Sequence, residues 1–92
     1  LAGIDTRPLV GHLAAWNYFM SVQSPANTEF LNLWRAHIRN PRRVTNDPME
    51  ATLVGFRMWA QAVTKARSTA VDAVRGAIIG EKVDAPSGYT LE

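Results

Sequence analysis

Apolar residues recur at helical spacing in three stretches of this chain, and the first lies between residues 25 and 38. Ser24 followed by Pro25 is typical of a helix start, because serine caps free backbone N–H groups and proline suits the first turn. The sequence Arg39-Asn40-Pro41 ends the pattern with a cation suited to the negative end of the helix dipole. We therefore expect a helix whose inward face is made by Phe30, Leu31, Trp34 and Ile38.

The longest apolar pattern runs from Pro48 to about Lys65 and predicts a second helix. Asp47 is the expected cap, and Glu50 stands three residues after it, which predicts a reciprocal capping box. One face carries Met49, Leu53, Phe56, Ala60 and Val63, and a neighbouring face carries Val54, Met58 and Ala62. Because apolar residues cover more than one face, we expect this helix to be contacted from two sides.

A third helix and a short extended pair complete the C-terminal half. Thr69 is expected to cap a helix that ends near Gly80 and turns Val71, Val74, Ala77 and Ile78 inward. The tail then predicts two short extended segments on either side of a Pro86-Ser87-Gly88 turn.

The segment before the first helix is mostly apolar, with aromatic residues at its end. Such a run is typical of a buried strand, so we expect one strand from Leu9 to Phe19; a helix over the same run is the alternative, because Leu13-Ala14-Ala15 does not distinguish the two. A single strand does not make a self-sufficient sheet. The predicted fold class is therefore α/β, a helix-rich fragment with about three helices, one buried strand and a short C-terminal extended pair, whose partner strands belong to a longer chain.

Length and composition fit one small globular domain. The chain has 92 residues, of which 47% are apolar and 20% charged, which is enough for a modest core. We expect a single domain over residues 1–90 and take Leu91-Glu92 as the remnant of an expression tag. The chain has no cysteine, which excludes disulfides and thiolate metal sites.

Positive charge is concentrated in one part of the chain. The net charge is +2, and Arg35, Arg39, Arg42 and Arg43 lie within nine residues of one another. Such a cluster is either a solvated helix end with its loop or a contact for phosphate groups. A small basic helical domain that binds nucleic acid is therefore one alternative, although no base-reading motif accompanies the cluster.

The residues that catalysis requires do not occur in recognisable patterns. There is no glycine-rich phosphate loop and no nucleophile elbow. His12 and His37 lack metal-ligand spacing. Asp47 and Glu50 are explained as acids of a first helical turn. We expect no enzyme, no cofactor and no bound metal.

Five segments, taken in order, resemble the urea- and short-chain-amide-binding proteins of ABC transporters. They are Gly11–Phe19, Ser24–Phe30, Arg43–Ala51 (RVTNDPMEA), Trp59–Ala66 and Asp84–Gly88. These proteins belong to the type I periplasmic solute-binding family, which also includes receptors for branched-chain amino acids. The order and spacing of the five segments extend the resemblance over nearly all of the chain.

The resemblance implies the late, C-terminal portion of a two-lobed periplasmic receptor. Such a receptor captures urea or a short-chain amide and delivers it to the membrane permease of an ABC transporter; the alternative within the same fold is a receptor for a branched-chain amino acid or another small polar solute. Because the other lobe would hold much of the site, we expect the isolated chain to bind solutes only negligibly, without micromolar affinity. We also expect self-association through apolar surface that the receptor would cover.

The candidate ligand-binding residues at the cleft are Trp16, Tyr18, Met49, Glu50 and Leu53. Trp16 and Tyr18 alternate at the end of the expected strand, so they share a face next to the ligand crevice of an open α/β sheet. The other three belong to the start of the long helix. Met20 and Leu53 depart from the family pattern, which usually has a polar residue and an aromatic residue there, and this affects the expected choice of solute.

Overall fold

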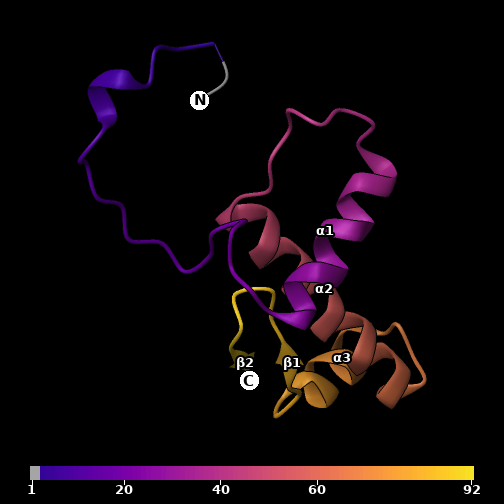
Figure 1. Ribbon diagram of the computed structural model, residues 1–92. Helices are drawn as coiled ribbons and strands as arrows, with labels where there is room; N and C mark the ends of the chain where they lie inside the picture. The colour runs from indigo at the N-terminus through magenta and orange to yellow at the C-terminus, as the bar shows by residue number, and fades with distance from the viewer. Residues whose placement is uncertain (1–2) are drawn as a thin grey trace.

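The computed structural model describes residues 3–92, and helices are its main secondary structure (Figure 1). Its elements are a 3₁₀ turn η1 (Arg7–Leu9), helices α1 (Pro25–His37), α2 (Asp47–Ala66) and α3 (Val71–Ile78), and strands β1 (Val83–Asp84) and β2 (Thr90–Leu91). The three helices and the C-terminal extended pair confirm the helix-rich fold class expected from the sequence.

Helix α2 is the central element of the fold, because both α3 and β1 pack against it. Val54 of α2, Val83 of β1 and Ala85 are buried together, with Met58 packed on them. Farther along α2, Ala62 is completely buried, and α3 also packs against this helix. The strands β1 and β2 pair antiparallel, with Val83 opposite Leu91.

The predicted strand from Leu9 to Phe19 is wrong. Leu9 ends η1, and residues 12–19 follow as an irregular arm that leaves the helices in Figure 1. The arm is largely exposed, and the side chain of Leu13 is 99% exposed. A strand needs a neighbouring strand to accept its hydrogen bonds, and among residues 3–92 the only strand pair is β1 with β2.

The arm also makes the molecule elongated. The radius of gyration is 16.4 Å, and the extents are 51 × 28 × 23 Å. A compact chain of this length has a radius of gyration of about 12 Å. The arm therefore contributes little to the core until Tyr18, which is 2% exposed.

The helix starts agree with the sequence in position but not always in detail. Ser24 caps α1, and its Oγ accepts a hydrogen bond from the Asn27 amide at 3.0 Å, as expected. The cap of α2 is Asn46 rather than Asp47, because Asn46 Oδ1 accepts from the Met49 amide at 3.1 Å. Glu50 is thus one residue too far along for a capping box, and that prediction is wrong.

Helix α3 begins at Val71, one residue later than predicted. Its cap position is Ala70, which offers no side-chain hydrogen bond, so Thr69 does not cap it. Val74 is buried as expected, but Val71 is 72% exposed, because it stands in the first turn, away from α2.

The aromatic residues of α2 do not lie in the core. Phe56 is 61% exposed and Trp59 45% exposed, and the two rings pack on each other with centroids 5.8 Å apart. The buried face of α2 is formed instead by Glu50, Val54 and Ala62. The apolar pattern predicted the helix, but the buried residues Val54 and Ala62 belong to the second of its two apolar faces, and contact from two sides stays a prediction.

Candidate functional site

Tyr18 anchors the arm to the helices through a buried polar cluster. Its hydroxyl donates to Asn27 Oδ1 at 2.8 Å and lies 2.9 Å from Thr45 Oγ1. The ring packs against Phe30 with centroids 6.0 Å apart and a tilt of 57°. The cluster therefore joins the end of the arm, the first turn of α1 and the residues just before α2.

Asn27 extends this cluster to the backbone of the loop before α1. Its side-chain amide donates to the carbonyl oxygens of Met20 at 3.1 Å and Val22 at 2.7 Å. Asn27 is 1% exposed, so each of these groups replaces water as a hydrogen-bond partner. These contacts tie the backbone at Met20 and Val22 to the first turn of α1.

The protonation state of Tyr18 follows from this environment. Burial raises the pKa of the Tyr18 phenol above its ordinary value, and the nearby Glu50 carboxylate raises it further, while the hydrogen bond with Thr45 opposes the shift. The hydroxyl therefore stays protonated at neutral pH and can donate to Asn27.

Glu50 connects the start of α2 to the turn between β1 and β2. The residue is 4% exposed, and its Oε1 accepts a hydrogen bond from the Ser87 amide at 3.2 Å. From the other side, Ser24 Oγ donates to the Pro86 carbonyl at 2.9 Å. Gly88 closes this turn with φ +93°, a backbone conformation that favours glycine.

Three hollows surround the first turn of α2. One, of about 300 Å³, is lined by Trp16, Tyr18, Phe19, Met20, Thr45, Asn46, Asp47 and Pro48. A second, of about 530 Å³, has a polar rim of Asn17, Asp47, Glu50, Ser87 and Tyr89. The third, of about 630 Å³, is an apolar groove that includes Phe30, Trp34, Met49, Leu53 and Phe56.

The predicted site residues are therefore gathered around one helix start but divided among three hollows. Trp16 and Tyr18 line the first, Glu50 the second, and Met49 with Leu53 the third. Trp16 is 61% exposed, whereas the hydroxyl of Tyr18 is already engaged within the protein. Segment 46–48 is the shared border, because one or more of its residues lines each hollow.

Asn17, Asn27, Thr45 and Ser87 take part in this region and were not singled out from the sequence. Asn27 carried a signal that was available: it precedes Phe30 by three residues and Trp34 by seven, so it is a polar residue on the apolar face of α1. Ser87 carried no such signal in the sequence, because its hydrogen-bond partner Glu50 is 37 residues away.

Neither a metal-binding group of side chains nor a membrane-spanning helix is found in the part of the chain that the structure describes. Among residues 3–92, no three or more histidine, cysteine, aspartate or glutamate side chains are grouped so as to hold a metal ion. Within the same residues, no helix has the length and apolar character needed to cross a bilayer.

Comparison with known proteins assigns this chain to a family. Residues 1–91 match the family model described as periplasmic binding protein domain. The curated proteins include none that matches this chain. The family model favours solute binding over catalysis and gives no support to the nucleic-acid-binding alternative. Because the match extends over almost the whole sequence, this chain belongs to the periplasmic binding protein domain family.

Proposed function

We propose that this chain forms part of a periplasmic receptor that binds urea or a short-chain amide and passes it to the permease of an ABC transporter. The proposal rests on membership of the family and on the resemblance of the Arg43–Ala51 segment to the urea and amide branch. In this role the protein makes and breaks no covalent bond.

The observation that carries the proposal is the polar rim of the hollow beside Glu50. Asp47 brings carboxylate oxygens that accept hydrogen bonds from the amino groups of urea or an amide, and Glu50 adds its Oε2, since its Oε1 already accepts from the Ser87 amide. Asn17, Ser87 and Tyr89 bring donors for the carbonyl oxygen. Both halves of an amide group therefore find partners around one hollow, whose lining also includes the apolar Val54 and Met58.

The hollow is open to solvent on this chain, so its affinity is limited. Urea has four heavy atoms, and a ceiling of about 1.5 kcal/mol per atom bounds a complete site at roughly −6 kcal/mol, or tens of micromolar. Water competes for every hydrogen bond in an open hollow, so we expect the chain alone to bind in the millimolar range or weaker.

A second candidate of the same class is a receptor for a branched-chain amino acid. The observation in its favour is the apolar groove of Phe30, Met49, Leu53 and Phe56, which begins at the same helix start as the polar hollow. An ammonium group would lie near Asp47, and an aliphatic side chain would enter the groove. Met20 and Leu53, where the resembled branch has polar and aromatic residues, agree with such a shift in preference.

Saturation-transfer difference NMR with paired ligands tests these proposals. Urea and acetamide are compared with N,N-dimethylacetamide, which keeps the carbonyl but lacks N–H donors, and with leucine. We expect a signal for urea and acetamide that is lost in the Asp47→Asn variant, with little signal for the dimethyl compound. A leucine signal that exceeds both would favour the amino-acid receptor, and equal signals for acetamide and its dimethyl derivative would contradict the hydrogen-bonding site.

A further inference from the structure

Half of the basic side chains in this protein are paired with acids, and the unpaired ones are concentrated at one corner. Of ten lysines and arginines, Arg7, Arg57, Lys65, Arg75 and Lys82 form ion pairs. Four of the remaining five are Arg35, Arg39, Arg42 and Arg43, for which no ion pair is found among residues 3–92.

The sequence around this corner supplies no compensating charge. No aspartate or glutamate occurs between Glu29 and Asp47. Basic residues in the last turn of α1 are explained by the helix dipole, which favours cations at that end. Arg42 and Arg43 lie beyond the helix, in the loop to α2, where the dipole falls off and gives no reason for further positive charge.

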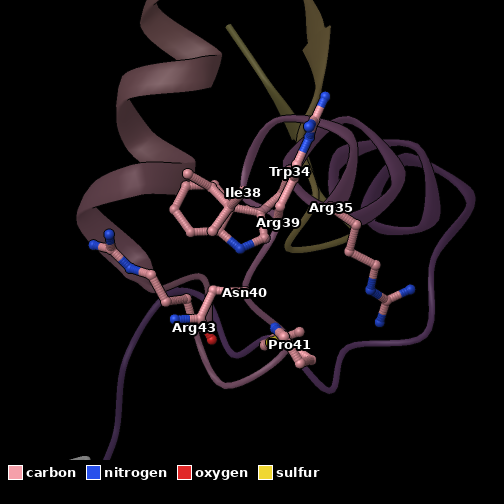
Figure 2. Close-up of a pocket in the computed structure, with 8 residues that line it drawn as sticks. Trp34, Arg35, Ile38, Arg39, Asn40, Pro41 and Arg43 are labelled. Carbon is pink, nitrogen blue, oxygen red and sulfur yellow. The ribbon is translucent and has the colours of Figure 1, made fainter.

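The corner encloses a hollow with an apolar centre and a basic edge. The hollow measures about 470 Å³ and is lined by Met20, Trp34, Arg35, Ile38, Arg39, Asn40, Pro41 and Arg43. Trp34 and Ile38 are half-buried. In Figure 2 the guanidinium groups of Arg35, Arg39 and Arg43 point in three different directions around the indole of Trp34.

The loop that carries the later arginines is held by short-range hydrogen bonds. The Arg42 amide donates to Asn40 Oδ1 at 3.0 Å, and the Arg43 amide donates to the Asn40 carbonyl at 3.1 Å. The Ile38 amide closes the end of α1 on the Trp34 carbonyl at 2.8 Å. The backbone therefore holds the apolar centre and the basic edge together, while the long side chains remain adjustable.

We propose that this hollow docks an acidic segment of a partner polypeptide, with one apolar side chain on Trp34 and Ile38 and carboxylates on the surrounding arginines. Guanidinium groups that spread outward suit several separated carboxylates better than one small anion, which needs donors that converge on a point. Nucleic acid suits the hollow less well, because it offers one half-buried indole and no row of exposed rings for successive bases.

Fluorescence anisotropy with a labelled peptide tests the proposal on the whole chain. The probe has a central leucine with two glutamates on each side, and the matched probe replaces every glutamate by glutamine. We expect the acidic probe alone to bind at low salt and to weaken several-fold as ionic strength rises toward about 0.15 M, where exposed charges are screened beyond ~8 Å. Removing Arg35 and Arg39 together as glutamines weakens binding roughly tenfold or more.

The control variant is Arg75→Gln, which removes one positive charge from α3, away from the hollow, and is compared with the single variant Arg39→Gln. It leaves binding within about twofold if contact at the hollow, rather than net charge, determines affinity. Equal loss in Arg75→Gln and in a single Arg39→Gln variant, equal binding of the glutamine probe, or no binding of the acidic probe at low salt would each overturn the proposal. Tighter binding of a single-stranded oligonucleotide than of the acidic probe under the same conditions would also overturn it.

Discussion

The hydroxyl of Tyr18 hydrogen-bonds to both α1 and the segment before α2, so its removal is the sharpest test of the fold. In a Tyr18→Phe variant the ring still packs on Phe30, but Asn27 Oδ1 and Thr45 Oγ1 each lose a partner. Both residues are buried, at 1% and 4% exposure, so water does not readily replace the lost hydroxyl.

The magnitude follows from the cost of a buried polar group without a partner, which is about 1–3 kcal/mol. Asn27 keeps the two hydrogen bonds from its Nδ2, so the loss falls on its Oδ1 and on Thr45. We expect Tyr18→Phe to lower the free energy of unfolding by about 2 kcal/mol. For a domain of this size that corresponds to a fall of roughly 8–16 °C in Tm, measured by circular dichroism with urea and thermal unfolding.

Two variants separate this explanation from a general effect of losing a tyrosine hydroxyl. Tyr89→Phe is the matched control, because Tyr89 is 70% exposed, and we expect a change below about 0.5 kcal/mol. Thr45→Val added to Tyr18→Phe removes one of the two orphaned groups, so the double variant is expected to regain part of the loss. A Tyr18→Phe variant as stable as the parent would refute the buried cluster.

Three further outcomes follow from the same contacts. Since the pKa of Tyr18 is raised in the folded state, the contribution of its protonated hydroxyl to folding stability is complete below the ordinary value of 10.0 and is lost as the pH rises beyond it. If stability falls equally above pH 10 in the Tyr18→Phe variant, this explanation is contradicted. Asn46→Ala is expected to cost about 1 kcal/mol by removing the cap of α2, whereas Asp47→Asn costs less than half of that; the reverse order in urea unfolding would restore Asp47 as the cap. Glu50→Ala is expected to cost about 1–2 kcal/mol by leaving the Ser87 amide without its acceptor, while Glu50→Gln retains a carbonyl oxygen and most of the stability. Amide hydrogen exchange at Ser87 should accelerate in Glu50→Ala and not in Glu50→Gln. Unchanged exchange in both variants would argue against the contact.

The helices could be predicted because their signals are local. Ser24-Pro25 and Asn46-Asp47-Pro48 combine a cap with a proline that suits the first turn, and neither depends on distant parts of the chain. The choice of Asp47 over Asn46 as cap failed because both residue types cap well, and only the backbone decides which one stands outside the helix.

The absence of a strand at residues 9–19 could not be predicted, because apolar content does not determine whether a partner strand is present. Residues 9–19 have the composition of a buried strand, yet Leu13 is 99% exposed. The composition of this arm is explained only if something else covers it, which a pattern of residue types within one segment does not reveal.

The candidate ligand-binding residues stay a prediction, while their place in the fold is defined. Met49, Glu50 and Leu53 line hollows at the start of α2, the helix that the segment RVTNDPMEA opens. The contacts of Glu50 with Ser87 and of Tyr18 with Thr45 join residues 37 and 27 positions apart. Such pairings are determined by how α1, α2 and the C-terminal turn pack together, so helical periodicity does not predict them.

The most direct test of the account is a heteronuclear amide spectrum of the ¹⁵N-labelled chain, recorded alone and with urea, acetamide and leucine at about 100 mM, a concentration that half-fills even a site with a Kd of ~100 mM. We predict dispersed peaks and shifts confined to Trp16–Met20, Asp47–Leu53 and the turn at Ser87 for one class of solute. Dispersed peaks whose shifts fall elsewhere, or that none of the three solutes moves, would contradict a solute-binding site at the start of α2.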